Sequence, residues 1–484
     1  MLNTSLARRG IAVASHALAA QSASAVLREG GNAIEAMVAA ASSIAVVYPH
    51  MTGIGGDAFW LIAAPGQAPI AIDASGGAAG QATLAFYAER HLQTIPTRGP
   101  LAANTVAGTI GGWAQALELS TQQWGGRLPL ARLLADSIFY ARDGVPVTLS
   151  QQRNTENKRA ELQPVTGFAE RFMPDGQVPL AGRLFKQTRL ANTLEQLTRR
   201  GLDDFYRGEL AQSMAEDLRA IGSPLQRTDL EHYRAKQVTP LQLSHRLGTL
   251  YNMTPPTQGV VSLAILGILD RLGISSMQAD SVEHIHAVVE ATKLAFLELR
   301  DKYITDPAYM QCDAQSLLED AALKALSARI DPHQARPWGS KTQPGDTIWM
   351  GVIDHEGRAV SFIQSIYHEF GAGVVLPGSH VNWQNRGCSF SLNPAHVNVL
   401  HPGKKPFHTL NPALARFHDG RVMVYGTMGG DGQPQTQAAV FTRYAEFQQP
   451  VQQAVTAPRW LLGRTWGSAS ETLKLESRFS SVVI

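Results

Sequence analysis

The sequence predicts an α+β fold, or a layered αββα arrangement, because helical and strand-like patterns occupy different parts of the chain. Alanine-rich segments with apolar residues at helical spacing come early, and helical patterns continue through most of residues 101–330. Short apolar runs separated by Gly and Pro turns follow residue 347, as expected of strands. With 484 residues, the chain should form one large elaborated domain or two lobes with a shared core.

The N-terminal region predicts two helices, a loop and a strand. Apolar positions at helical spacing cover residues 16–48, and the break at Glu29–Asn32 indicates that one helix ends and another begins. A glycine-rich loop follows at residues 49–57. The run Ala58–Ala63 is then predicted to be a strand.

The central region is predicted to be mostly helical, with short breaks. Its periodic segments are Leu130–Asp143, Leu190–Gly201, Leu210–Ile221 and Val282–Tyr303. Leu250–Gly259 contains adjacent prolines and predicts a rigid turn before another apolar helix. The polar residues 335–346, rich in Pro, Gly and Ser, are predicted to be a surface linker.

The segment Gly345–Asp354 is the most informative part of the chain. Small and acidic residues lead into Thr347, which opens an apolar, strand-like run. A turn at His355–Arg358 and a second run at Ala359–Ile366 predict a β-hairpin. This pattern is typical of a self-cleavage site between Asp346 and Thr347, although Thr347 could also simply begin a strand, as β-branched residues do.

Cleavage at this bond would give Thr347 a free α-amine beside its hydroxyl. One residue then carries both nucleophile and base. An α-amine titrates near pH ~8, against ~10.4 for lysine, so part of it is neutral and can accept a proton at physiological pH. The segment therefore predicts an N-terminal threonine nucleophile.

The composition narrows the function classes. Hydrophobic residues make up 44% of the chain and charged residues 17%, and the formal net charge is +2. This balance argues against a nucleic-acid partner or an acidic membrane surface. No apolar run reaches the ~20 residues that span a bilayer, and the N-terminus lacks the pattern of a secretory signal. With only Cys312 and Cys388, a disulfide framework is not expected, and the cytoplasm is the predicted location.

Several further motifs occur in a characteristic order along the chain. They are Gly30–Ala36, Gly53–Asp57, Phe205–Gly208, Pro255–Gly259, Glu290–Phe296 with Arg300, Asp306-Pro307, Asp346-Thr347 and Gly429-Gly430. In this combination, over nearly the whole length, the chain resembles the γ-glutamyltransferases, self-processing members of the N-terminal nucleophile hydrolase superfamily.

The resemblance implies a four-layer αββα sandwich that matures by cleavage. Residues 1–346 would form a large subunit and residues 347–484 a strand-rich small subunit, intertwined in one domain, and two such heterodimers could pair. Thr347 would be both the processing residue and the nucleophile, and Ser365 would orient it. Gly429 and Gly430 would hold the oxyanion through backbone N–H groups, because glycine lets the backbone approach the substrate closely. No cofactor or metal is implied.

The positions that bind the glutamyl group in the family hold other residues here. Ser75 stands at the place of an arginine, Tyr367 of an asparagine, Arg386 and Ser389 of a glutamine and an aspartate, and His408 and Thr409 of paired serines. The partner for a substrate ammonium is therefore lost, while Arg386 offers a fork suited to a carboxylate at short range. The substrate implied is a small carboxylate-bearing amide without an α-amine, with oxamate, giving oxalate and ammonia, as the leading candidate.

Other interpretations stay open. The enzyme could be a γ-glutamyl hydrolase or transpeptidase acting on glutathione, a glutaryl-type acylase, or an unprocessed pseudoenzyme that binds a small acid. Arg386 could form a salt bridge at the subunit seam, Ser365 could be an ordinary strand serine, and the glycine motifs could be turns without a ligand. His284 and His286 have metal-ligand chemistry but point to different helix faces. Cys388 lacks a patterned histidine partner and is expected to be a small buried residue.

Overall fold

The computed structural model describes residues 3–339, 347–464 and 470–484. The chain divides into two compact units, each built around its own sheet. The six-stranded unit comprises Arg9–Val238 and Asp346–Phe407, and the four-stranded unit comprises Met1–Arg8, Thr239–Gly345 and His408–Ile484. Each unit therefore contains residues from both sides of the predicted cleavage site.

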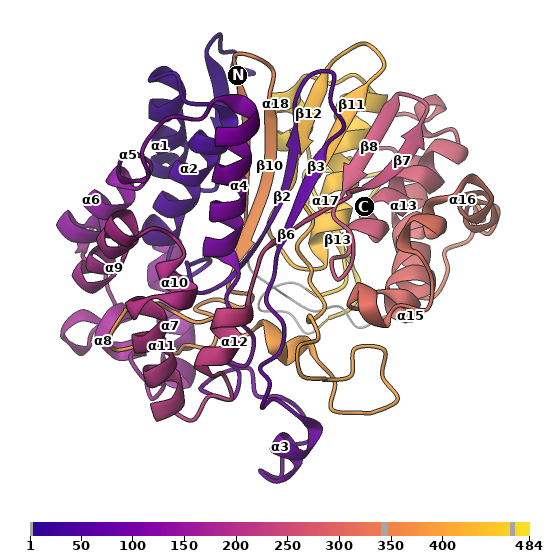
Figure 1. Cartoon of the computed structure of the whole chain (residues 1–484). Helices are drawn as coiled ribbons and strands as arrows, with labels where there is room; N and C mark the ends of the chain where they lie inside the picture. The colour runs from indigo at the N-terminus through magenta and orange to yellow at the C-terminus, as the bar shows by residue number, and fades with distance from the viewer. Residues whose placement is uncertain (1–2, 340–346, 465–469) are drawn as a thin grey trace. The chain divides into compact units, whose positions relative to one another are not determined.

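The sheet of the six-stranded unit has the order β1-β9-β10-β2-β3-β6 (Figure 1). Its strands are β1 (Gly10–Val13), β2 (Asp57–Ala63), β3 (Ile70–Ala74), β6 (Lys236–Val238), β9 (Ile348–Asp354) and β10 (Ala359–Ser365). All neighbouring pairs are antiparallel. Strands β2 and β10 are buried along their entire length, so the centre of this sheet is enclosed on both faces.

Helices α1 (Ala17–Arg28), α2 (Ala33–Val47) and α4 (Thr109–Trp124) pack against this sheet (Figure 1). The remaining helices and short strands of the unit are α3 (Leu84–Ala88), α5 (Leu130–Leu133), α6 (Ala135–Asp143), α7 (Leu149–Leu162), α8 (Phe168–Phe172), α9 (Thr188–Arg200), α10 (Asp204–Arg207), α11 (Glu209–Ala220), α12 (Arg227–His232), β4 (Val145–Pro146) and β5 (Leu184–Phe185). Of these, α5 and α6 contact α2, and α6 in turn contacts α9.

The break predicted at Glu29–Asn32 is confirmed, and its cause is a capping box. The Asn32 side chain accepts hydrogen bonds from the backbone N–H groups of Ile34 and Glu35, and Glu35 accepts one from the Asn32 N–H. These bonds satisfy donors at the start of α2 that lack partners within the helix. The helix is buried along its whole length, so its ends must be satisfied by protein groups.

The four-stranded unit has the sheet order β12-β11-β8-β7. Its strands are β7 (Leu241–His245), β8 (Gly248–Asn252), β11 (Ala413–Phe417) and β12 (Val422–Tyr425), with a small pair β13 (Trp460–Leu462) and β14 (Leu473–Leu475). Its helices are α13 (Gly259–Arg271), α14 (Val282–Leu294), α15 (Asp301–Tyr303), α16 (Asp320–Ser327), α17 (Gly432–Phe441) and α18 (Val451–Thr456). Helix α13 packs on β7 and β8 and contacts α14 and α17.

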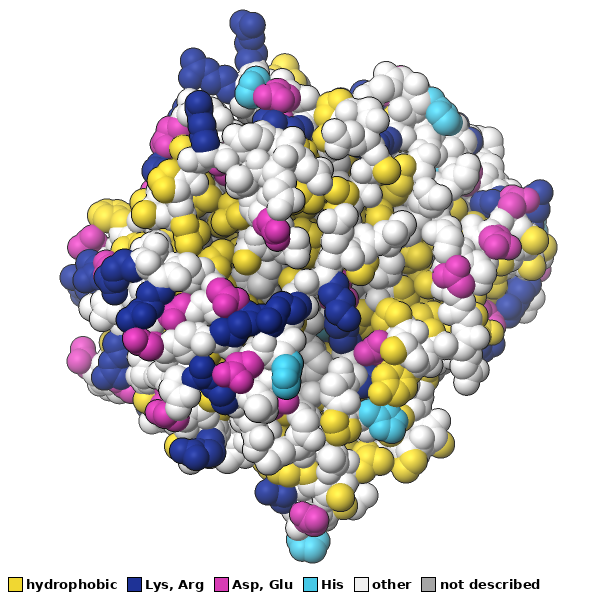
Figure 2. Space-filling view, in the orientation of Figure 1, with side chains coloured by type: hydrophobic (Ala, Val, Ile, Leu, Met, Phe, Trp, Pro, Cys, Tyr) yellow, Lys and Arg dark blue, Asp and Glu magenta, His cyan; other side chains and the backbone are white. Residues whose placement is uncertain are grey.

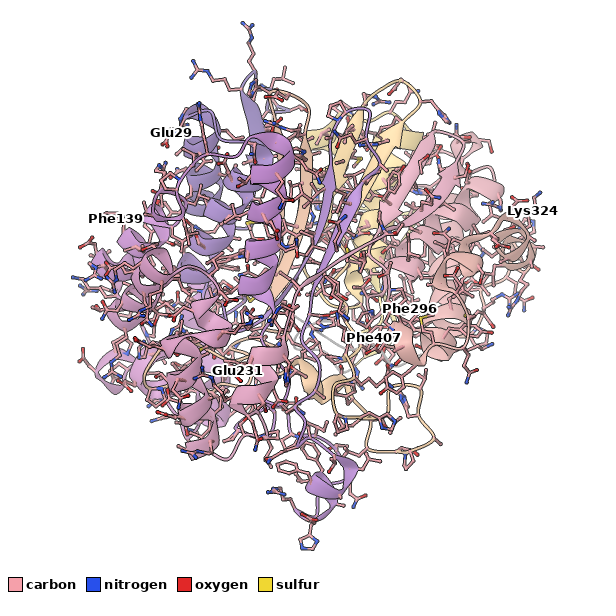
Figure 3. All side chains as sticks on the ribbon, viewed as in Figure 1. Glu29, Phe139, Glu231, Phe296, Lys324 and Phe407 are labelled. Atoms are coloured by element: carbon pink, nitrogen blue, oxygen red, sulfur yellow. The ribbon has the colours of Figure 1, made fainter. Side chains whose placement is uncertain are left out.

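Two expectations for the central region need correction. Strands β6 to β8 lie between residues 236 and 252, within the region that the sequence predicts to be mostly helical. The burial of Leu241–His245 alternates residue by residue, the period of a half-buried strand. The helix predicted at Val282–Tyr303 is present, but a π-helical turn at Ala295–Arg300 interrupts it. Phe296, labelled in Figure 3, lies in this turn. Its ring packs against that of Trp338.

The distribution of charged side chains on the surface agrees with the formal net charge of +2. In Figure 2, lysine and arginine side chains are interspersed with aspartate and glutamate over the visible face. Among the described residues, no helix combines the length and apolar character needed to cross a bilayer.

Candidate active site

Thr347 lies immediately before β9 and is fully buried. Strands β9 and β10 pair antiparallel, with Ile348 opposite Gln364, so the hairpin predicted around His355–Arg358 is confirmed. This register brings Thr347 beside Ser365, the last residue of β10. The Thr347 Oγ1 hydroxyl donates a hydrogen bond to Ser365 Oγ at 3.2 Å. Asp346, on the other side of the predicted cleavage site, lies outside the described residues.

Ser365 Oγ also accepts a bond from the backbone N–H of Tyr367 at 2.8 Å, and Arg386 Nη2 lies 3.5 Å away, at the limit of a hydrogen bond. Ser365 is fully buried. Three donors therefore converge on one oxygen, which holds the serine hydroxyl in a defined position next to the threonine. The predicted residues Thr347, Ser365, Tyr367 and Arg386 form one cluster in the six-stranded unit.

Arg386 begins a short 3₁₀ turn, Arg386–Ser389, and is only 1% exposed. Its guanidinium stacks on the Tyr367 ring at 3.9 Å, a cation–π arrangement. Burial lowers the pKa of Arg386, while the nearby Tyr367, Asp57 and Cys388 act to raise it. Tyr367 has a backbone φ of +78°, an unfavourable conformation for a bulky residue. Such strain persists only where the surroundings hold it, and it is common at functional sites.

Asp57 is an acidic residue whose charge and that of Arg386 act on each other. Sequence reasoning did not identify it as functional. It is the first residue of β2, lies opposite Ser365 in the β2–β10 register, and is fully buried. Its Oδ1 accepts hydrogen bonds from the backbone N–H groups of Gly76 at 3.1 Å and Gly108 at 3.0 Å. Burial raises the pKa of Asp57 to about 7, against the opposing effect of the Arg386 charge.

The glycine-rich loop before Asp57 packs tightly against the cluster. A Cβ on Gly56 would lie 2.1 Å from the Ser365 carbonyl oxygen, and one on Gly55 would lie 2.2 Å from the Asn382 carbonyl oxygen. Only glycine allows these approaches. The loop therefore serves close packing at the end of β10, and this packing accounts for Gly55 and Gly56.

Ser75, which the resemblance puts at the place of the family's arginine, hydrogen-bonds an acidic side chain of the protein. Its hydroxyl donates to Asp73 Oδ1 at 2.5 Å, and its backbone N–H bonds the same oxygen. The second Asp73 oxygen accepts from Lys405 Nζ at 2.6 Å. Sequence reasoning missed Lys405, because the pairing joins residues more than 300 positions apart.

Ser389 and the neighbours of Arg386 complete the six-stranded part of the site. The Ser389 hydroxyl donates to the carbonyl of Phe407, which is labelled in Figure 3, at 3.1 Å. Burial raises the pKa of the Cys388 thiol to about 12, so this residue is a poor nucleophile. Burial also lowers the pKa of His368 to about 3, so its ring, 4.4 Å from that of Tyr367, is neutral at physiological pH.

The remaining predicted residues lie in the four-stranded unit. Gly429 and Gly430 have φ values of +108° and +53°, in the turn before α17. Gln258 Nε2 donates to the carbonyls of Thr409 at 2.8 Å and Gly430 at 3.0 Å, which links two predicted positions. His408 exchanges backbone hydrogen bonds with the segment at residues 256–258. Within this unit, the predicted residues thus gather around Gln258.

The two histidines weighed as metal ligands point to different partners. His284 Nε2 lies 3.2 Å from Thr442 Oγ1, and His286 Nε2 lies 2.8 Å from the Asp331 carbonyl. His284 is buried and His286 contributes to a half-buried surface. The different surroundings agree with their expected placement on different faces of one helix.

Among the described residues, His245, Asp270 and Glu446 form one cluster with metal-ligand chemistry, their ligand atoms lying within 4.8 Å of one another. His245 Nδ1 accepts a bond from the Leu247 N–H, which places the proton of the neutral ring on Nε2, facing the carboxylates. Arg246 pairs with both carboxylates. The cluster is therefore an ion-pair network, and burial lowers the pKa of His245 to about 4.

Comparison with known proteins extends these observations. The family model described as Gamma-glutamyltranspeptidase matches residues 19–484. The chain is 58% identical to the oxamate amidohydrolase proenzyme of Klebsiella pneumoniae subsp. pneumoniae, over 100% of this chain and 91% of that protein. It is 39% identical to the glutathione hydrolase-like YwrD proenzyme of Bacillus subtilis, over 98% of this chain and 88% of the relative.

Among solved structures, the cephalosporin acylase from Bacillus halodurans superposes with a TM-score of 0.88 at 33% identity, covering 99% of this chain and 87% of that one. The predicted fold class, an α+β sandwich of the N-terminal nucleophile hydrolase type, is confirmed by this likeness.

Proposed function

Because this chain belongs to the gamma-glutamyltranspeptidase family, we propose that it is a self-processing amidohydrolase with Thr347 as its nucleophile. The observation that carries the proposal is the 3.2 Å hydrogen bond from Thr347 Oγ1 to Ser365 Oγ, at a fully buried position where a strand begins. The relatives described as proenzymes support maturation by cleavage.

In the precursor, the Thr347 hydroxyl attacks the carbonyl carbon of Asp346. The acyl group moves from the nitrogen to the oxygen of Thr347, and water hydrolyses the resulting ester. The products are a new carboxylate on Asp346 and a free α-amine on Thr347. Ser365 orients the hydroxyl for this attack and for later turnover.

In turnover, the Thr347 α-amine takes the proton of the hydroxyl, and the oxygen attacks the amide carbonyl of the substrate. The family role assigned to Gly429 and Gly430 is to stabilise the oxyanion through backbone N–H groups. Collapse of the tetrahedral intermediate expels ammonia, which takes up the proton held by the amine. Water then attacks the acyl-enzyme ester, releasing the acid and restoring Thr347.

The substrate we favour is oxamate, hydrolysed to oxalate and ammonia. In oxamate the carboxylate is bonded directly to the amide carbonyl, so the cation that binds it must lie close to the nucleophile. Arg386 meets this requirement, since it is joined to Thr347 through a single oxygen, Ser365 Oγ. The oxamate amidohydrolase relative supports the same choice.

We further propose that the chains 1–346 and 347–484 remain together as a heterodimer after cleavage, and that two heterodimers pair. Strands β9 and β10, beyond the cut, are hydrogen-bonded to β1 and β2, which precede it. Separating the chains would break two strand–strand interfaces in a buried sheet. We propose substrate-binding roles for Tyr367 and Ser389 in the six-stranded unit, and for His408 and Thr409 in the four-stranded unit. We also propose that the enzyme acts in the cytoplasm.

An ammonia-release assay tests the substrate. Purified enzyme and the Arg386→Ala variant are offered oxamate, glutamine, glutathione and a glutaryl amide. Preferred hydrolysis of oxamate, with a raised KM in the variant, supports the proposal. Preference for γ-glutamyl compounds with no effect of the substitution would favour a glutathione hydrolase, and preference for the glutaryl amide an acylase, the activities in the names of other relatives.

A further inference from the structure

Asp57 occupies a position from which it can control the substrate-binding arginine. It is fully buried at the start of β2 and lies opposite Ser365 in the strand register. Backbone N–H groups of Gly76 and Gly108 hold its Oδ1. The carboxylate is therefore fixed in place, and its charge and that of Arg386 act on each other.

The other titratable groups that face Asp57 are neutral at physiological pH. The charge of Asp57 acts on the hydroxyls of Tyr206 and Tyr233, and burial raises the pKa of both hydroxyls well above the usual value. The charge of Asp73 also acts on Tyr233, and the Asp73 carboxylate is paired with Lys405. These surroundings leave Arg386 as the cation whose charge acts on Asp57.

Two titratable groups near Arg386, Cys388 and His368, are uncharged at physiological pH. The pKa of the Cys388 thiol is about 12 and that of His368 about 3, in both cases because of burial. Tyr367 contributes a phenol ring stacked on the guanidinium. Arg98 is a second cation whose charge acts on Cys388 and His368, but it is paired with Glu161. A substrate carboxylate that enters this site meets Arg386, and the charge of the buried Asp57 acts on that cation.

We propose that Asp57 is a positioning residue: it is the internal counter-ion that holds the Arg386 guanidinium beside Ser365 and competes with the substrate carboxylate for its charge. This inference rests on the proposed function, because it assumes that Arg386 binds the substrate. It adds a residue that sets how strongly, and at which pH, an anionic amide is bound.

The competition makes substrate affinity depend on pH. With a pKa of about 7, Asp57 is protonated at lower pH, and the full charge of Arg386 is then available to the substrate. At higher pH Asp57 ionises and offsets that charge. A bound anion repels the ionised carboxylate and raises its pKa, so binding takes up a proton. Affinity therefore falls as pH rises above about 7, by up to about tenfold per pH unit.

The test measures the inhibition constant of oxalate, the proposed product, against amide hydrolysis from about pH 5.5 to about pH 8.5. Four proteins are compared: wild type, Asp57→Asn, Arg386→Ala and Asp354→Asn. The last is the matched control, since Asp354 is a buried carboxylate of the same sheet that pairs with Arg358. The expected result is a constant that rises with pH in the wild type and the control, and that starts lower and rises less steeply in Asp57→Asn.

The α-amine of Thr347 is present in all four proteins and titrates in the same range. Only the difference in slope between wild type and Asp57→Asn therefore measures Asp57, and equal slopes overturn the inference. If Arg386→Ala weakens oxalate binding but Asp57→Asn keeps the wild-type pH slope, the role proposed for Asp57 is wrong and the proposed function stands. If Arg386→Ala leaves oxalate binding unchanged, the proposed function fails with it. If Asp57→Asn does not fold, the pH profiles of the oxalate inhibition constant in wild type and Asp57→Glu test the proposal. A flat wild-type profile overturns it. A profile in Asp57→Glu that rises at a different pH supports it.

Discussion

Thr347 and Ser365 face each other across the β9–β10 hairpin, with their hydroxyl oxygens 3.2 Å apart and both side chains fully buried. The residues are 18 positions apart, and the antiparallel register alone brings them together. A hairpin is a local structure, so it can form before any cleavage. The precursor therefore already contains the geometry that processing requires.

Thr347→Ala should abolish both cleavage and activity, because alanine supplies no hydroxyl for either step. Thr347→Ser should retain both. Gel electrophoresis with N-terminal sequencing measures cleavage, and ammonia release measures activity. The matched control is Thr292→Ala, which removes a buried threonine hydroxyl bonded to the Val288 carbonyl in α14 and should cleave normally. An active Thr347→Ala protein with an intact chain would falsify the mechanism.

Ser365→Ala should slow cleavage and lower kcat by roughly ten- to a hundredfold, the effect of losing a hydrogen bond worth about 1.5–3 kcal/mol. The reason is that Thr347 Oγ1 loses its acceptor and Tyr367 loses the partner of its N–H. Ser361→Ala is the control on the same strand, where the serine accepts a bond from Trp349 Nε1. If both substitutions lowered cleavage and kcat equally, the effect would come from a less stable strand and not from the orientation of Thr347.

Arg386→Ala should raise the KM for oxamate by roughly ten- to a hundredfold, since a charge-assisted bond to the substrate is lost. Arg386→Lys should restore only part of the affinity, because an ammonium cannot form the bidentate fork. The matched control is Arg171→Ala. Arg171 is also buried and lies over an aromatic ring, but it bonds Gln187 and the His380 carbonyl. A KM effect as large in Arg171→Ala would contradict the binding role.

Gly56→Ala should destabilise the protein by about 1–3 kcal/mol, the usual range for overpacking, because the added Cβ would lie 2.1 Å from the Ser365 carbonyl oxygen. It should also slow cleavage, since the end of β10 must move. Gly53→Ala in the same loop is the control: its Cβ would lie 3.7 Å from its nearest neighbour and fits without change. Urea denaturation measures the difference, and similar stability of the two variants would refute the packing argument.

The sequence predicted the parts of this fold that depend on local patterns. The helix restart at Asn32 and the hairpin after Thr347 follow from capping and turn signals within short windows. The position of Ser365 beside Thr347 was expected from the family resemblance. The strands at Leu241–Asn252 were missed although Leu241–His245 alternates, because the surrounding region is helical and biased the interpretation.

The roles of Asp57 and Lys405 could not be predicted, for a different reason. Asp57 meets Ser365 only through the pairing of β2 with β10, about 300 residues apart in the chain. Lys405 meets Asp73 through an equally distant contact. No periodicity or motif carries such information. The function of each carboxylate depends on which cation the folded chain places beside it.

Stability should fall with decreasing pH because of His50, whose pKa is lowered to about 3, first by burial and then by the charge of His16. Unfolded, this ring takes up a proton near pH ~6.5, whereas the folded protein excludes it. Each pH unit below about 6.5 therefore costs roughly 1.4 kcal/mol of unfolding free energy, until the folded pKa is reached. Urea denaturation of wild type and His50→Gln at about pH 7 and about pH 5 measures this slope, and an unchanged slope in the variant would assign it to other groups. His355→Gln is the matched control, since that histidine is exposed and should leave the slope as it is.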